Sequence, residues 1–145
     1  MAMNTPLQLE HYFFEKMHCV ANPDFDFEQA EEENLADSDD FLVKTGLARN
    51  TENEQEFQIR VEAQFQPGNS KSARYEFEFS AVGFFKVDPD FEHDDIERLV
   101  QINGASVLYS AMREFVLTIT SRGPYGPLML PTINFRLFSQ AGKQE

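Results

Sequence analysis

Several residue types are scarce or absent in this chain of 145 residues. Cys19 is the only cysteine, so no disulfide can form within the chain, and a reducing cytoplasm is the natural compartment for it. The N-terminus lacks a basic segment followed by an apolar stretch, and every apolar run is far shorter than the roughly 20 residues of a membrane-spanning helix. We therefore expect a cytoplasmic protein with no export signal and no membrane insertion.

Basic residues are also few, because 12 Lys and Arg stand against 25 Asp and Glu, which gives a formal net charge of −13. This charge repels the phosphate backbone of nucleic acids and anionic lipid headgroups. We therefore expect no nucleic-acid partner and no membrane partner. The acidity serves solubility, or it forms a surface that meets basic or apolar partners, and the two roles are compatible.

Motifs for catalysis and metal binding are not found. The chain has no G-x-S-x-G, no phosphate-binding loop and no dinucleotide fingerprint. His18 and Cys19 would point to opposite sides of a strand, so they cannot hold one metal ion together. The acidic stretch 92–95 lacks the glycine-containing pattern of a calcium loop and fits a capping turn. The sequence therefore predicts no catalytic residue, no metal site, no cofactor and no enzymatic activity.

The clearest positive pattern is strict alternation of apolar and polar residues in two stretches. The length suits one domain over 1–145, and 41% hydrophobic residues with 15 Phe provide for a core. The alternation and the turn-forming residues 67–72 predict an antiparallel hairpin with one apolar face. Val82, Phe84 and Phe85 break the alternation around Gly83, which indicates a bulge, a twist or burial on both faces. The apolar series is Phe57, Ile59, Val61, Ala63 and Phe65, then Tyr75, Phe77, Phe79 and Ala81.

A strand is also expected at the N-terminus, over 7–20, with apolar residues on both faces. A neighbouring subunit on one side, or burial within one chain, explains this equally well. Simple alternation assigns Leu9, Phe13, Met17 and Cys19 to one face and Tyr12, Phe14 and Val20 to the other.

The segment 24–50 is expected to vary in structure. Its residues 28–40 include no Lys or Arg, so their carboxylates repel one another, and we predict a long, mobile acidic loop. Residues 41–50 then predict a short, irregular edge strand that Gly46 interrupts.

Helical patterns follow the hairpin. Acidic residues over 88–95 form a capping turn, and 96–101 predict one or two helical turns. From Gly104 onwards we predict one long helix that ends in a glycine cap at Gly123. Small residues along this helix would let a second helix approach closely.

The next stretch, 121–135, reads SRGPYGPLMLPTINF. Its three prolines lack a backbone N–H and fix their φ angles, so an ordered, extended loop is expected rather than a helix or a central strand. Leu128, Met129 and Leu130 in such a loop either cover the core of the protein or form a surface for a partner.

The order of these elements, together with specific residues near the C-terminus, resembles the SecB protein-export chaperone family. The likeness extends over about residues 7–138 and is sharpest over 113–135. The residues that carry it are Arg113, Glu114, Ser121, Arg122, Gly123, Tyr125, Leu128, Leu130, Asn134 and Phe135.

The resemblance implies an α+β fold in which a four-stranded antiparallel sheet packs with one long helix. The C-terminal helix of the family would be shortened or absent here. The resemblance also implies subunits that pair and pairs that form a tetramer, with apolar grooves that hold unfolded polypeptide clients without ATP. By this resemblance the client-binding residues are Tyr125, Leu128, Met129, Leu130, Phe84 and Phe85. The alternative that Leu128 and Leu130 belong to the core stays open.

SecB chaperones transfer clients to the SecA motor through acidic residues on the outer face of the sheet and through a C-terminal segment. Glu76 and Glu78 match that acidic site, whereas Lys16 and Val20 stand where further acidic residues are expected. SecA is therefore one expected partner. A client-specific chaperone, for instance one associated with a toxin–antitoxin pair, or a dedicated interaction protein without SecA transfer, is the alternative. An enzyme that uses a Phe-rich cavity near His11 or Tyr12 is a third.

Overall fold

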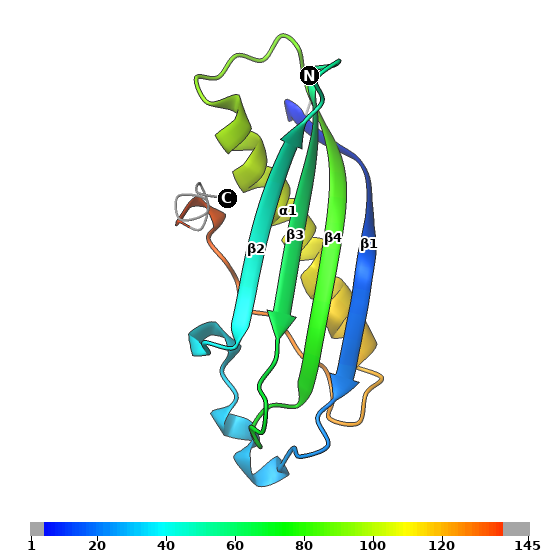
Figure 1. Cartoon of the computed structure of the whole chain (residues 1–145), viewed down its shortest axis with the longest axis vertical. Helices are drawn as coiled ribbons and strands as arrows, with labels where there is room; N and C mark the ends of the chain where they lie inside the picture. Colours follow the sequence, from blue (N-terminus) through cyan, green and yellow to red (C-terminus); the bar gives the residue numbers. More distant parts are fainter. Residues whose placement is uncertain (1–4, 138–145) are drawn as a thin grey trace.

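A computed structural model of the chain describes residues 5–137. Four strands form one antiparallel sheet in the order β1-β4-β3-β2, and a single long helix lies across one face of it (Figure 1). This confirms the α+β fold that the sequence predicts. The elements are β1 Leu7–Ala21, the 3-10 helices η1 Phe27–Glu32 and η2 Leu35–Asp37, β2 Phe41–Arg49, β3 Glu56–Phe65, β4 Tyr75–Val87 and α1 Ile96–Thr120.

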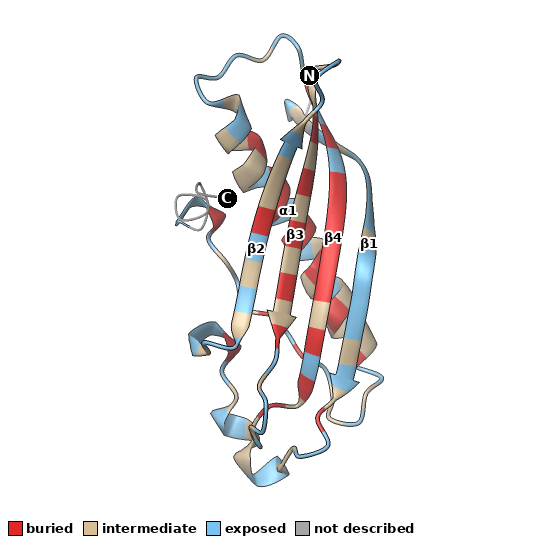
Figure 2. Cartoon of the chain, viewed as in Figure 1, coloured by how far each residue is buried: buried red, intermediate tan, exposed pale blue. Residues whose placement is uncertain are grey.

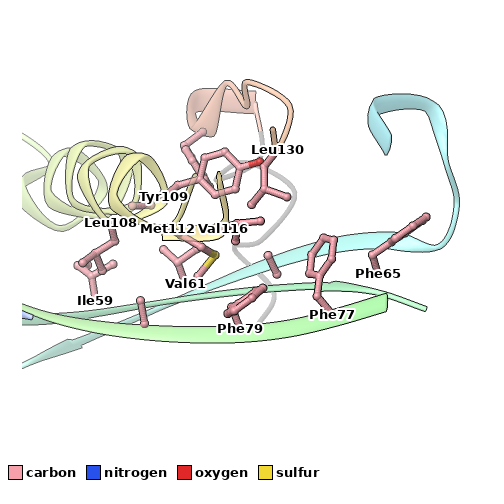
Figure 3. Packing of buried hydrophobic residues seen from close by; sticks show 14 of the residues in the cluster. Ile59, Val61, Phe65, Phe77, Phe79, Leu108, Tyr109, Met112, Val116 and Leu130 are labelled. Atoms are coloured by element: carbon pink, nitrogen blue, oxygen red, sulfur yellow. The ribbon is translucent and has the colours of Figure 1, made fainter. Parts of the chain in front are cut away.

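The predicted hairpin is β3 and β4, and its apolar face forms the floor of the core. Buried and partly exposed residues alternate along β3 without a break, as Figure 2 shows, because only one face of the strand is covered by α1. The helix contributes Val100, Leu108, Met112 and Val116, all fully buried. Figure 3 shows the last three above the sheet. The prediction for this hairpin is confirmed.

Gly83 marks a close approach of α1 to the sheet and not a bulge. A Cβ built on Gly83 would lie 2.8 Å from Cδ2 of Leu108, and one built on Gly104 of α1 would lie 2.9 Å from Cγ1 of Ile59. Val82 points to the opposite face and is nevertheless only 2% exposed. Of the three explanations for the broken alternation, burial on both faces is therefore correct.

The faces of β1 follow from two irregularities in its pairing with β4, where Glu10 and Glu15 are the extra residues. Each inserted residue shifts the following side chains to the other face of the sheet. Tyr12 and Phe14 therefore share a face with Gly83 and Ala81 of β4, the face that α1 covers, whereas Phe13 pairs with Val82 on the other face. The simple alternation expected for these three residues is wrong, and beyond Glu15 the second shift restores the expected faces.

The segment before β2 is more ordered than expected. Leu35 is buried in the core, and Glu33 forms an ion pair of 2.9 Å with Arg74. The backbone N–H of Asp26 also donates to the carbonyl oxygen of Lys71 at 2.8 Å. These anchors correct the prediction of a long, mobile acidic loop. The edge strand β2 is likewise regular over nine residues, and Gly46 pairs with Arg60 without interrupting it.

Helix α1 is one helix of 25 residues and not two separate helical segments. The carboxylate of Asp95 accepts the backbone N–H of Arg98 at 3.2 Å and so caps its first turn. Gly123 is not a left-handed cap, since the positive-φ glycines of the described chain are Gly68 and Gly126. Its role is steric, because a Cβ at Gly123 would lie 2.6 Å from the phenol oxygen of Tyr75.

The described chain ends in helical residues 135–137. The expectation of a shortened or absent C-terminal helix falls mainly on residues 138–145, which lie outside the described residues. Within 5–137, no helix combines the length and the apolar character needed to cross a membrane.

Candidate functional site

The loop 121–134, called here the connecting loop, folds back over the end of α1 and the start of β4. Its first half is held by three hydrogen bonds of 2.8 Å. Tyr75 donates its O–H to the carbonyl of Gly126, Arg74 donates to the carbonyl of Pro127, and the hydroxyl of Thr120 accepts the N–H of Leu128. Proline has no backbone N–H and cannot take full part in the hydrogen bonding of a β-sheet. These side chains therefore provide the hydrogen-bond partners of the loop backbone.

Two further bonds fix the second half of the connecting loop to α1. Arg113 donates to the carbonyl of Leu130 at 2.9 Å, and Tyr109 donates its O–H to the carbonyl of Pro131 at 2.6 Å. Burial raises the pKa of the Tyr109 phenol and of the Tyr75 phenol above the usual range, so both keep the proton that they donate at neutral pH. The loop is therefore an ordered, extended segment, as predicted.

Three of the six residues that the resemblance assigned to client binding lie in the core. Leu128 is 2% exposed, Leu130 is fully buried and Phe85 is 2% exposed. Leu130 lies among the helix residues Tyr109 and Val116, above the sheet (Figure 3). In this structure these three side chains cover the core, which corrects the expectation that they face a client. Met129, between the two leucines, is 60% exposed.

Tyr125, the fourth of the six residues assigned to client binding, belongs to a group of aromatic side chains. This group lies where the connecting loop contacts the segment that follows β1. We call Phe25, Phe27, Tyr75 and Tyr125 the aromatic cluster. Ring centroids of Phe25 and Tyr125 are 4.6 Å apart, those of Phe25 and Phe27 are 5.0 Å apart, and those of Phe27 and Tyr125 are 5.8 Å apart. Phe27 is 70% exposed, so the cluster presents aromatic surface to solvent.

The backbone around the aromatic cluster is fixed by Asn22 at the end of β1. Its side-chain amide donates to the carbonyls of Ser70 and Ala73 at 2.8 and 2.6 Å, and its own carbonyl accepts the O–H of Tyr125 at 2.8 Å. The carboxylate of Asp26 caps η1 by accepting the N–H of Glu28 at 2.9 Å. The cluster therefore consists of rings held on a fixed backbone, within a stretch rich in carboxylates.

Sequence reasoning missed Phe25 and Phe27. Both lie within the stretch that we interpreted as an acidic, mobile loop, next to Asp24 and Asp26. Their spacing of two in an extended segment was the available signal, since it places both rings on one side.

A second exposed apolar group lies on the outer face, defined as the face of the sheet opposite α1. It consists of His11, Phe13 and Phe84, called here the outer-face patch, with ring centroids 5.8 to 6.4 Å apart. Phe84 is 38% exposed and Phe13 is 40% exposed. Phe84, unlike its neighbour Phe85, is therefore available for contact.

Glu76 and Glu78 also lie on the outer face. Glu78 forms an ion pair of 2.9 Å with Lys16, while Glu76 is exposed and pairs in register with Val20. Nearby, Arg60 forms an ion pair with Glu15 and donates to the hydroxyl of Ser80 at 3.2 Å. Two of the carboxylates on this face, those of Glu15 and Glu78, are thus paired with a cation.

Residues suited to metal or redox chemistry do not converge. Within residues 5–137, no group of three or more His, Cys, Asp or Glu side chains could hold a metal ion. Cys19 packs against the core, and burial raises the pKa of its thiol, which lowers the thiolate fraction at neutral pH. The described site is therefore a set of apolar and aromatic surfaces on a fixed scaffold, and such surfaces bind apolar segments.

Two known proteins with similar sequences are named protein-export protein SecB. Protein-export protein SecB of Anaplasma phagocytophilum is 32% identical over 60 residues, which are 41% of this chain and 38% of that protein. Protein-export protein SecB of Bradyrhizobium diazoefficiens is 24% identical over 93 residues, which are 64% of this chain and 57% of that protein. The matches thus span less than two thirds of the length of these relatives.

Among solved structures, the Mycobacterium tuberculosis Rv1957 SecB-like chaperone, in complex with a ChAD peptide from the Rv1956 HigA1 antitoxin, has the same fold. It aligns with a TM-score of 0.64 and 15% identity, over 88% of this chain and 91% of that one. The family model for preprotein translocase subunit SecB matches residues 22–145, which is most of the chain. The chain therefore belongs to the SecB family.

Proposed function

We propose that this protein is an ATP-independent, SecB-like chaperone that binds unfolded segments of other polypeptides. The observation that carries the proposal is the aromatic cluster, with Phe27 70% exposed on a backbone that hydrogen bonds hold in place. Apolar and aromatic side chains of an unfolded chain gain by covering such a surface. No catalytic step or cofactor is part of this function, and we place it in the cytoplasm.

The fixed backbone favours binding because little ordering is left to occur when a client arrives. The connecting loop and Asn22 hold Tyr125 before any contact is made, which reduces the entropy cost of binding. The surrounding carboxylates, including Asp24, Asp26 and Glu28, favour clients that carry Lys or Arg beside their apolar residues. A cationic side chain can also lie over the aromatic rings.

The residues that we assign to client contact are Phe27, Tyr125, Met129 and Phe84. Phe27, Met129 and Phe84 are exposed, and Tyr125 is half-buried beside Phe27. Leu128, Leu130 and Phe85 support this surface from the core. Adaptable Met129 suits contact with clients of varied sequence.

Two biological settings fit this activity. The names of the two SecB relatives support clients that are preproteins on their way to export. The Rv1957 chaperone, solved with a peptide of an antitoxin, supports a client-specific role as the alternative. Both settings require the same contact with a non-native segment, so the surface described above serves either.

SecA and further copies of this chain are the partners that we propose beyond the client. Glu76 and Glu78 would meet basic residues of SecA on the outer face. Strand β1 is an edge of the sheet and exposes Met17 and Val20, which favours pairing with a second subunit and then a dimer of dimers. Light scattering of the purified protein, alone and with SecA, measures self-association and SecA binding. A mass equal to one chain would argue against self-association, and no gain in mass on addition of SecA would argue against SecA binding.

The proposed activity predicts that the protein suppresses aggregation of a chemically denatured, aggregation-prone protein on dilution, at near-equal molar amounts and without ATP. Turbidity is the measurement, and an unrelated soluble protein of similar net charge is the control, because acidity alone contributes to solubility. Suppression no better than that of the control protein would contradict the proposal.

A further inference from the structure

A cavity within residues 5–137 lies away from the aromatic cluster. It has a volume of about 520 Å³ and lies between the first turns of α1 and the end of the described chain. Figure 1 shows this end of the chain, in orange and red, beside the N-terminal half of α1. The volume falls in the range of about 300–1,000 Å³ that is usual for ligand sites.

Two arginines, Arg98 from α1 and Arg136 from the segment after the connecting loop, line this cavity. Neither guanidinium takes part in an ion pair with another residue of the described chain. Both guanidinium groups are therefore available to a ligand in the same cavity. We call this cavity the arginine cavity.

Among the remaining polar groups of the arginine cavity, Asn134 also favours an acceptor as the ligand, whereas the amide of Asn103 already donates to the carbonyl of Leu99 at 3.0 Å. The side-chain oxygen of Asn134 accepts the N–H of Arg136 at 3.0 Å, which leaves its two amide hydrogens without a partner in the described chain. Asp95, the one carboxylate in the lining, already accepts the N–H of Arg98. Against this single negative charge stand two guanidinium groups, so the lining has an excess of positive charge.

The cavity is also partly apolar, because Leu99, Ile102 and Leu137 belong to its lining. A ligand that fits must therefore combine a negative acceptor with an aliphatic group. A highly charged anion such as a nucleic acid is disfavoured, because the net charge of −13 repels it. A single carboxylate carries less charge and matches the planar fork of a guanidinium.

We propose that the arginine cavity binds a peptide carboxylate that stands next to an aliphatic side chain. Arg98 and Arg136 bind the carboxylate, and Asn134 donates a further hydrogen bond to it. Leu99 and Ile102 contact the aliphatic group. The carboxylate comes from an Asp or Glu side chain or from the C-terminus of a polypeptide. The site differs from the aromatic cluster in chemistry, so it does not depend on client capture there.

Short peptides without aromatic residues separate the two sources by isothermal titration calorimetry of the full chain at low salt. One peptide reads Ser-Gly-Ser-Glu-Leu-Leu with an amidated C-terminus, a second carries Gln in place of Glu and a free C-terminus, and a third carries Gln and an amidated C-terminus. At least one of the first two is expected to bind about ten-fold more tightly than the third, as a charge-assisted hydrogen bond predicts. The tighter of the two identifies the source.

The variants Arg98→Gln and Arg136→Gln are each expected to remove most of that ten-fold preference. Arg122→Gln is the matched control, because Arg122 is exposed beyond the other end of α1 and its loss changes the net charge equally. The temperature of thermal unfolding should be unchanged in all three variants, since the two cavity arginines have no ion-pair partner in the described chain. Equal affinity for all three peptides, equal loss in Arg122→Gln, or binding of inorganic phosphate without any peptide would overturn the proposal.

Discussion

Replacing Leu130 with alanine is expected to lower the free energy of unfolding by about 2–5 kcal/mol, the usual cost of a Leu→Ala change in a core. Leu130 is fully buried, and its backbone carbonyl accepts a hydrogen bond from Arg113 that orders the connecting loop. The truncation leaves a cavity that this ordered loop cannot easily fill. Urea denaturation followed by circular dichroism measures the effect.

Met129→Ala is the matched control for that measurement, because Met129 is adjacent in the same segment but 60% exposed. Its loss should change stability by no more than about 0.5 kcal/mol, as for most surface substitutions. Equal effects of the two substitutions would contradict the burial described here. Weakened client binding in Leu130→Ala, with unchanged stability, would restore Leu130 as a contact residue.

Replacing Phe27 with alanine is expected to weaken the binding of an unfolded polypeptide about ten-fold, because an aromatic contact residue is often worth more than 1 kcal/mol. Phe27 presents most of its ring to solvent and packs on Tyr125 and Phe25. The measurement is fluorescence anisotropy of a labelled, permanently unfolded chain titrated with the protein. The fold should be retained, since little core is lost.

Leu42→Ala is the matched control for Phe27→Ala. Leu42 is 46% exposed on β2, outside both the aromatic cluster and the outer-face patch. This control removes apolar surface of a comparable kind from another place. Equal weakening by both substitutions would mean that the aromatic cluster has no special part in binding.

The sheet and the helix were predictable where one face of an element is covered, because burial of that face produces a periodic pattern of apolar residues in the sequence. Phe57 to Phe65 alternates because one face of β3 is covered, by α1 and by buried residues of the connecting loop such as Leu130. The faces of β1 were not predictable in the same way, because Glu10 and Glu15 bulge and shift the side chains between them. A glutamate in a bulge looks like any other exposed glutamate in the sequence.

The candidate site was predictable in part, because the three prolines require an irregular segment and the structure shows an ordered one. Which side chains of that segment point inwards depends on contacts that are distant in sequence, such as those from Tyr75 and Arg113 to its carbonyls. The spacing of Leu128 and Leu130 was an unused signal, because alternate residues of an extended segment share a side. It predicts that both leucines lie on one side of the segment and Met129 on the other.

The central claim, that this SecB-family protein binds polypeptides because they are unfolded, is tested most directly by one comparison. A small protein and a permanently unfolded variant of it are titrated separately with the full chain, and the two dissociation constants are measured by anisotropy under identical salt conditions. The account predicts measurable binding of the unfolded variant and at least about a hundred-fold weaker binding of the folded protein, whose apolar residues are buried. Equal affinity for both, or no binding of either, would contradict it.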